Sequence, residues 1–190
     1  MNRLPPIICL IFISLSSYAQ LKFEKEERIK KEDVPVGAVR FVDSMQLSGR
    51  IKWFKEIGYN KISYEAKTKH QGKRLSIEFS EEGIFEDAEV EIKSAEITQA
   101  AFKKISDYLQ EAHAKFKINK VQIQYSGDTH RILNYFVREA DEKSLTINYE
   151  IVITTKTDGA FVMYEYLFGK NGVLIQKSRV TSRMTDNLEF

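Results

Sequence analysis

The chain has almost no cysteine. Of its 190 residues only Cys9 is a cysteine, and it lies in the apolar segment at the N-terminus. If that segment is removed, the mature protein has no thiol, which excludes disulfides, thiolate metal sites and a cysteine nucleophile. Long apolar runs are also scarce. After the N-terminal segment, no stretch approaches the roughly 20 apolar residues that a membrane-spanning helix needs.

Signatures of catalysis are lacking as well. His70, His113 and His130 are far apart, and none has a partner at the spacing of a metal site, so we expect surface histidines. The carboxylate pairs Glu81-Glu82 and Asp141-Glu142 are typical of solvated turns. No Gly-x-Ser-x-Gly elbow, phosphate loop or dinucleotide fingerprint occurs. We therefore expect no enzymatic activity, no cofactor and no metal.

The charge balance argues against nucleic-acid binding. The chain has 29 Lys and Arg against 27 Asp and Glu, with both signs interspersed. The one basic group is the set Lys67, Lys69, Lys73 and Arg74, which flanks an expected turn and is typical of a solvated hairpin tip.

Residues 1–19 have the features of a secretory signal peptide. Arg3 is followed by the apolar stretch from Ile7 to Leu15, and small residues precede a predicted cleavage after Ala19. The stretch is too short for a membrane anchor, so we expect no stable membrane insertion after cleavage. Export without disulfides favours a bacterial periplasm, with secretion as the other possibility. Residues 20–32 are rich in Lys and Glu and predict a flexible lead-in, and residues 183–190 predict a loose tail.

Residues 62–92 organise the first half. Three runs alternate apolar and polar residues, which predicts strands with one apolar and one solvated, charged face. Gln71-Gly72 and Glu82-Gly83 mark tight turns between them. The apolar members are Ile62, Tyr64, Ala66, Leu75, Ile77, Phe79, Ala88, Val90 and Ile92.

A second copy of this pattern occurs from residue 147 to residue 180. Tyr149-Glu150 corresponds to Tyr64-Glu65, and Phe168 with Gly172 corresponds to Phe79 with Gly83. Because both matches occur in the same order, they predict an internal duplication.

Two helices are expected, one before each copy. The first begins near Asp33 as cap with Pro35 in its first turn, and the second covers residues 94–116. Residues 126–143 have no equivalent in the first half and predict either an inserted short helix or an elongated hairpin. The aromatic residues Trp53, Phe54 and Tyr59 are expected to pack in the core between helix and sheet.

The chain resembles the PepSY-like family of β-lactamase-inhibitor-like exported proteins. The residues that carry the likeness are Val34-Pro35, Ile51-Lys52-Trp53-Phe54, Tyr64-Glu65, Ser76-Ile77-Glu78-Phe79, Gly83, Tyr149-Glu150, Phe168 and Gly172. The resemblance implies an α+β fold in which tandem helix-plus-sheet repeats, residues 33–94 and 95–182, form one curved antiparallel sheet with helices on one side. It also implies a non-catalytic, exported binding or inhibitory module. Residues 126–143 depart from a simple two-repeat plan.

The outward face of the second copy is apolar where that of the first is polar. Val152, Phe161, Met163 and Leu167 accompany Glu165 there, whereas Ser63, Glu65, Ser76 and Glu78 occupy the first. One hypothesis is a partner-binding surface. The other is that residues 132–137 or the C-terminal tail cover these side chains.

We therefore expect a binding module in the bacterial envelope, acting on a periplasmic protein partner such as an enzyme that it restrains. The alternative is a periplasmic carrier or sensor that holds a small molecule on the concave face of the sheet. A third possibility is a purely structural role in the envelope.

Overall fold

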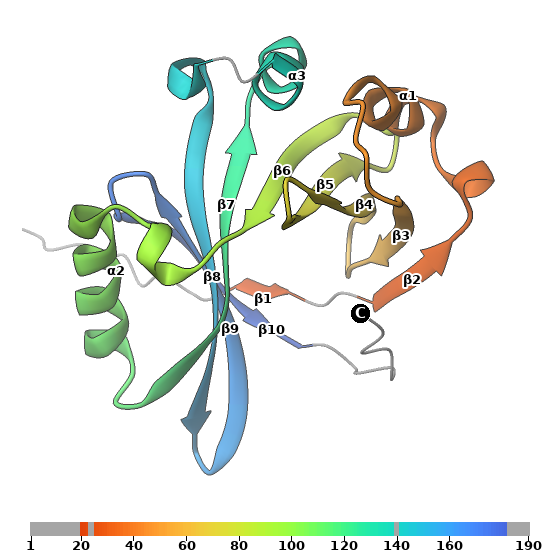
Figure 1. Cartoon of the computed structure of the whole chain (residues 1–190). Helices are drawn as coiled ribbons and strands as arrows, with labels where there is room; N and C mark the ends of the chain where they lie inside the picture. Colours follow the sequence, from red (N-terminus) through yellow and green to blue (C-terminus); the bar gives the residue numbers. More distant parts are fainter. Residues whose placement is uncertain (1–19, 23–24, 139–140, 182–190) are drawn as a thin grey trace, which may run out of the picture.

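A computed structural model describes residues 20–22, 25–138 and 141–181. The predicted signal peptide and residues 183–190 lie outside this part. The fold is α+β, as expected, and is built on one ten-stranded sheet in the order β1-β10-β9-β8-β7-β6-β5-β4-β3-β2 (Figure 1). No helix in the described part is long and apolar enough to cross a membrane. The strands are β1 (Gln20–Lys22), β2 (Lys25–Ile29), β3 (Lys52–Ile57), β4 (Ile62–His70), β5 (Lys73–Ser80), β6 (Phe85–Glu91), β7 (Phe116–Ser126), β8 (Thr146–Thr157), β9 (Ala160–Gly169) and β10 (Leu174–Val180).

The expected flexible lead-in supplies both edges of the sheet instead. β1 pairs in parallel with β10, and β2 pairs antiparallel with β3, while all the other neighbours are antiparallel. Only two residues separate β1 from β2 in sequence, so the two edges lie within about 11 Å of each other at that corner. The sheet must therefore curve strongly. The many Lys and Glu residues of this segment led us to expect a flexible, solvated lead-in. Charged residues are, however, also common on edge strands.

The helices cover one face of the sheet. The two edges of the sheet close toward each other over the opposite face, so the helix-covered face is the convex one. α1 (Val36–Ser44) and α3 (Thr129–Arg138) share one core cluster with residues of β3–β8, among them Trp53, Phe79 and Tyr125. α2 (Gln99–Ala112) packs on β7–β9 around Ile105, Tyr166 and Phe168. Figure 1 shows α2 at one side and α1 and α3 at the top, with the strands between them. The predicted apolar face of the strands is this helix-covered face.

The helix boundaries differ from those expected. Asp33 ends a short 3-10 helix (Lys31–Asp33), and α1 begins after Pro35 without a side-chain cap. The second predicted helix is divided, since a 3-10 turn (Ser94–Glu96) precedes α2. Thr98 caps α2 by accepting a hydrogen bond from the Ala101 amide at 3.4 Å. The chain becomes extended at His113, so Phe116 already belongs to β7.

Residues 31–91 form a 3-10 turn, a helix and four strands; residues 94–180 follow this order except that α3 and a 3-10 turn (Glu142–Ser144) lie between β7 and β8. Tyr64 lies opposite Phe79 on β4–β5, and Tyr149 lies opposite Phe168 on β8–β9. The turns after these strands also correspond. Gly83 and Gly172 have the same positive φ of 78°, and each packs against the first turn of a helix, α1 and α2 respectively.

Residues 126–143 contain α3, so of the two alternatives for this segment the short helix is correct. The predicted aromatic cluster is not one group. Trp53 is buried in the core with α1, whereas Phe54 lies on the opposite face under the Lys67 ammonium and Tyr59 is 64% exposed. Strand alternation separates Trp53 from Phe54, because successive residues point to opposite faces.

Candidate functional site

The concave face of the sheet carries closely packed carboxylates. In strand register, Glu65 lies directly opposite Glu78, and Glu78 lies directly opposite Asp87. Glu89 follows on the same face of β6, and Glu150 lies two strands away on β8. We call these five residues the carboxylate cluster. Like charges directly opposite in a sheet repel, so the arrangement costs stability.

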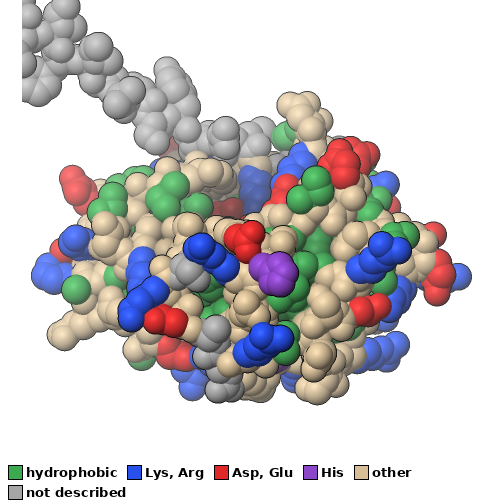
Figure 2. Space-filling model, turned by 90° about the horizontal axis from the view of Figure 1, so that it is seen from above, with side chains coloured by type: hydrophobic (Ala, Val, Ile, Leu, Met, Phe, Trp, Pro, Cys, Tyr) green, Lys and Arg blue, Asp and Glu red, His purple; other side chains and the backbone are tan. Residues whose placement is uncertain are grey.

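Three of these carboxylates are buried and Glu78 and Asp87 are half-buried, which corrects the expected solvated outer face. Glu65, Glu89 and Glu150 are only 4%, 5% and 7% exposed. Their burial follows from the curvature, because the sheet edges close toward each other over the face that carries them. By contrast, the surface seen from above α1 and α3 has acidic and basic side chains scattered over it (Figure 2).

Carboxylate oxygens of Glu78, Asp87 and Glu89 lie within 4.8 Å of one another, close enough to surround one cation. A second such group is Glu26, Glu56 and Glu65. Two buried acceptors near the first group, Asp87 Oδ1 and Gln122 Oε1, have no hydrogen-bond partner among the residues that the structure describes. The other Asp87 oxygen accepts a hydrogen bond from Gln124 Nε2 at 3.2 Å. Negative and acceptor groups therefore outnumber donors here.

Burial and mutual repulsion raise the pKa of Glu78, Asp87, Glu89 and Glu150. Burial, with the negative charge of Glu150, raises the pKa of Asp87 to about 7. Burial raises the pKa of Glu78 and of Glu89 well above the usual value, and neighbouring carboxylates add to both shifts. At neutral pH the Asp87 carboxyl is therefore partly protonated.

Lysines compensate part of the charge around the cluster. Lys67 Nζ lies 2.7 Å from Glu26 and 2.9 Å from Glu65, and Lys120 Nζ lies 3.8 Å from Glu150. Lys22 on the edge strand β1 pairs with Glu165 at 3.0 Å. Desolvation by itself would lower the pKa of Lys67, but the carboxylates of Glu65 and Glu26 raise it overall.

The predicted binding residues lie together on the same concave face, along β8 and β9. We call Val152, Phe161, Met163 and Leu167 the hairpin patch. Phe161 is 80% exposed and Met163 is 37% exposed, whereas Val152 is only 8% exposed and Leu167 is half-buried. Phe161 stands next to the Asp158-Gly159 turn, where the hairpin projects from the body of the protein (Figure 1). The accessible part of the patch is thus its outer end.

One of the two suggested covers for this patch lies elsewhere. The segment around Ile132 and Phe136 forms α3 and packs on the helix-covered face, where Phe136 meets Tyr125 with ring centroids 5.6 Å apart. The other suggested cover, the C-terminal tail, lies outside the described residues from residue 182 onward.

The three histidines lie on different elements. His70 ends β4, His130 begins α3 and is exposed, and His113 follows α2. His113 is not a plain surface histidine, because its Nε2 lies 2.6 Å from the Tyr166 hydroxyl and its ring packs against Tyr164. Burial and the nearby Lys177 lower its pKa. His113 therefore packs against the core beneath α2, at the C-terminal end of that helix.

Sequence reasoning missed the carboxylate cluster. It placed Glu65 and Glu78 on one face, but it treated that face as solvated. Asp87, Glu89 and Glu91 on β6 were the available signal, since three acids at alternate positions on a strand between two others bring like charges together.

No protein-family model and no curated protein matches the chain. Solved structures do resemble it. A DUF2874 family protein from Bacteroides ovatus ATCC 8483 has 13% identity and a TM-score of 0.50, over 77% of this chain and 89% of that one. A protein from Bacteroides eggerthii DSM 20697, inferred to be periplasmic, also has 13% identity and a TM-score of 0.50, over 80% and 94%. A BLIP-like protein from Bacteroides fragilis NCTC 9343 has 15% identity and a TM-score of 0.47, over 81% and 92%. At such identities the first two likenesses concern the fold alone.

Proposed function

We propose that this protein is an exported, non-catalytic binding module that holds a periplasmic protein partner through the outer end of its hairpin patch. The observation that carries the proposal is the exposure of Phe161 beside Met163 at the tip of a projecting hairpin. Exposed aromatic and Met side chains are enriched where proteins bind one another. If the partner is an enzyme, occupation of its surface by this hairpin would restrain it.

Export rests on two independent supports. Residues 1–19 have the order of charges, apolar residues and small residues that a signal peptide has. The fold neighbour from Bacteroides eggerthii is itself inferred to be periplasmic. The absence of cysteine from residues 20–190 is compatible with either redox environment.

We propose a non-catalytic role because of how the reactive residue types are distributed. The histidines occupy three separate elements, and the groups with metal-ligand spacing in the described part of the chain consist of carboxylates alone. A catalytic assignment would need a nucleophile or base oriented by a partner.

We also propose that the two halves are copies of one PepSY-like unit, residues 33–94 and 95–182. The matched pairs Tyr64–Phe79 and Tyr149–Phe168 support this proposal, as do the matched contacts of Gly83 and Gly172 with a helix. In such a duplicated frame the hairpin patch is where the second copy diverged.

A photoreactive benzophenone amino acid in place of Phe161 tests the binding site. We expect covalent linkage to one envelope protein in native cells, because the side chain would lie within the interface. Ile84, which is 64% exposed in the β5–β6 turn, is the control position. Equal linkage from both positions, or none from position 161, would contradict the proposal.

A second candidate function is supported by the carboxylate cluster. Unpaired acceptors on Asp87 and Gln122, beside three convergent carboxylates, favour a small cationic ligand on the concave face, either a metal ion or an amine. The protein would then act as a carrier or sensor.

A further inference from the structure

A pocket of about 270 Å³ lies between α3 and the sheet, near the turn that joins β4 to β5. We call it the α3 pocket. Leu75, Val90 and Tyr125 line it from the sheet, and Tyr135 and Phe136 line it from α3. Leu75 lies directly opposite Val90, and both belong to the helix-covered face, as does Tyr125 on the next strand. The lining side chains therefore converge on one space from two sides.

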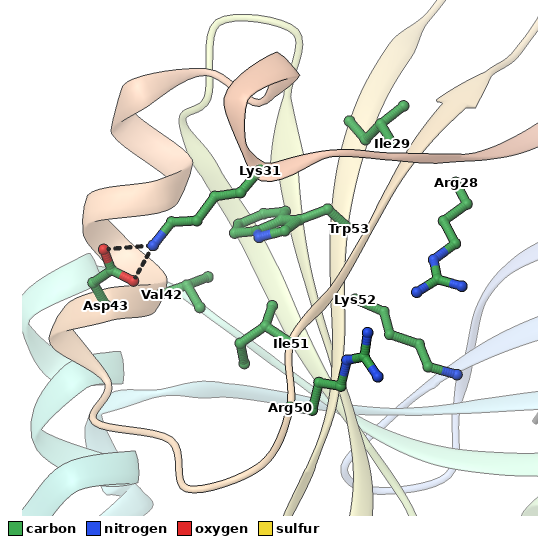
Figure 3. Close-up of a pocket in the computed structure, with 9 residues that line it drawn as sticks. All are labelled: Arg28, Ile29, Lys31, Val42, Asp43, Arg50, Ile51, Lys52 and Trp53. Carbon is green, nitrogen blue, oxygen red and sulfur yellow. Dashed lines mark hydrogen bonds and ion pairs between the residues drawn. The ribbon is translucent and has the colours of Figure 1, made fainter.

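Another cavity, of about 250 Å³ between β2, β3 and α1, does not have this convergence (Figure 3). Trp53 lies there on the helix-covered face, whereas strand alternation turns Lys52 to the opposite face. Arg28 lies opposite Phe54 in register, so it too is on that opposite face. Because one small ligand could not contact both sets of residues, we infer no site from this cavity.

The walls of the α3 pocket are aromatic. The ring centroids of Tyr125 and Tyr135 are 4.9 Å apart, and Phe136 meets Tyr125 edge to face at 5.6 Å. The His70 ring meets Phe136 edge to face at 6.1 Å. Leu75, which is only 1% exposed, forms an apolar floor beneath them. Such a lining favours a flat apolar ring, which can make further edge-to-face contacts.

The α3 pocket also contains a pair of hydroxyl groups. Tyr135 Oη donates a hydrogen bond to Tyr125 Oη at 3.1 Å. This bond uses one of the two hydroxyl hydrogens, so the other remains for an acceptor. Neither hydroxyl is bonded to another side chain among the residues that the structure describes. Because Tyr125 is only 6% exposed, and a buried tyrosine hydroxyl usually has a partner, an oxygen atom of a ligand fits this position.

The exposed rim of the α3 pocket offers little net charge. Lys73 Nζ is paired with the Glu96 carboxylate, so its charge is compensated. Gln71 is neutral, and the remaining polar residue of the lining is His70. A ligand of this pocket therefore needs no charged group.

α3 has no counterpart in the first half of the chain, where β3 leads directly to β4. Two of the ring side chains that line the pocket, Tyr135 and Phe136, come from this helix. The pocket therefore exists only because of the additional segment between β7 and β8.

We propose that the α3 pocket binds a small uncharged aromatic molecule of two fused rings that carries one hydroxyl or carbonyl oxygen. A cavity of about 150 Å³ is enough for benzene, so about 270 Å³ holds a two-ring system. The rings pack between Leu75 and Phe136, and the oxygen atom bonds to the Tyr125–Tyr135 pair. This site lies on the helix-covered face, whereas the hairpin patch and the carboxylate cluster lie on the concave face. Binding here therefore does not depend on the proposed function.

Calorimetric titration of residues 20–190 with 2-naphthol, and separately with naphthalene, tests this proposal. We expect one saturable site for 2-naphthol and about tenfold weaker binding of naphthalene, which has the rings without the oxygen. In the wild-type protein, NMR cross-relaxation from the bound 2-naphthol ring should reach the methyl groups of Leu75 and Val90. Absence of saturable 2-naphthol binding, or cross-relaxation to other methyl groups only, would overturn the proposal.

A Tyr125→Phe, Tyr135→Phe double variant tests the role of the hydroxyl pair. We expect about tenfold weaker binding of 2-naphthol and unchanged binding of naphthalene. Removal of both partners of a buried hydrogen bond costs little stability, so the variant should remain folded. The matched control is a Tyr108→Phe, Tyr164→Phe double variant, which changes two half-buried tyrosines outside the pocket and should bind 2-naphthol as the wild type does. An undiminished preference for 2-naphthol in the folded Tyr125, Tyr135 variant would contradict the proposed site.

Discussion

Replacement of Gly172 by Ala is expected to destabilise the protein by about 4 kcal/mol. A Cβ atom at this position would lie 2.6 Å from the Ala101 carbonyl oxygen and 3.0 Å from the Ala101 Cα. Both are backbone atoms of α2, so neither can move without displacing the helix. The φ of +78° adds a cost of about 1 kcal/mol for any L side chain.

Gly72→Ala is the matched control for this prediction. Gly72 has nearly the same φ, +79°, but a Cβ there would meet nothing within 4 Å. It should cost about 1 kcal/mol, which isolates the conformational term from the clash. Gly83→Ala should resemble Gly172→Ala, because its Cβ would lie 2.6 Å from Pro35 Cβ and 3.1 Å from the Ala38 nitrogen. Urea unfolding measures all three, and equal losses at positions 72 and 172 would contradict the described docking of α2.

Replacement of Asp87 by Asn is expected to stabilise the protein at pH 8 by about 2 kcal/mol and to change little at pH 4.5. The pKa of Asp87 is raised to about 7 in the folded state, from the ordinary 3.8. A raised folded pKa gives stability that is fully present below the unfolded value and is lost as pH rises through 7. The Asn variant avoids that loss because it carries no charge. Its side-chain oxygen still accepts from Gln124.

Melting temperatures between pH 4.5 and pH 8 measure this effect, with an expected gain of about 4–8 °C at pH 8. Glu81→Gln removes an exposed acid outside the cluster and should show no such pH dependence. A destabilised Asn variant at pH 8 would contradict the described repulsion. Calcium and spermidine, added separately at pH 8, test the proposed binding of a cationic ligand. A cation that binds the cluster would raise the melting temperature of the wild type and not that of the Asn variant.

Local sequence patterns were sufficient to predict many of the strands, turns and helices. Alternation identified β4, β5 and β6, and the glycine-containing turns were correctly placed, since Gln71, Gly72, Asp158 and Gly159 all have positive φ. Apolar spacing located both α1 and α2. These features depend on residues within a few positions of one another, so a single sequence contains the information that specifies them.

Long-range pairing was not accessible in the same way. The strands β1 and β2 lie at opposite edges of the sheet although they are nearly consecutive in sequence. Their closure over the concave face buries Glu89 and Glu150, and no local pattern distinguishes a solvated acid from one enclosed by distant strands.

The four predicted binding residues differ in exposure along the β8–β9 hairpin. Alternation correctly put Val152, Phe161, Met163 and Leu167 on one face, but exposure varies with distance from the hairpin turn. Phe161 lies near the tip, opposite Lys156, whereas Val152 sits between Lys120 and Glu165 farther inside. A pattern of period two indicates which face of the sheet a side chain occupies, but not how deeply that side chain is buried.

The most direct test of partner binding is affinity capture from native periplasm with a Phe161→Ser, Met163→Ser double variant. Ile84→Ser, which changes another exposed apolar side chain, serves as the control. We expect a stoichiometric protein partner with the wild type and the control, and its loss from the double variant at an unchanged melting temperature. Retention of that partner by a folded double variant would contradict it.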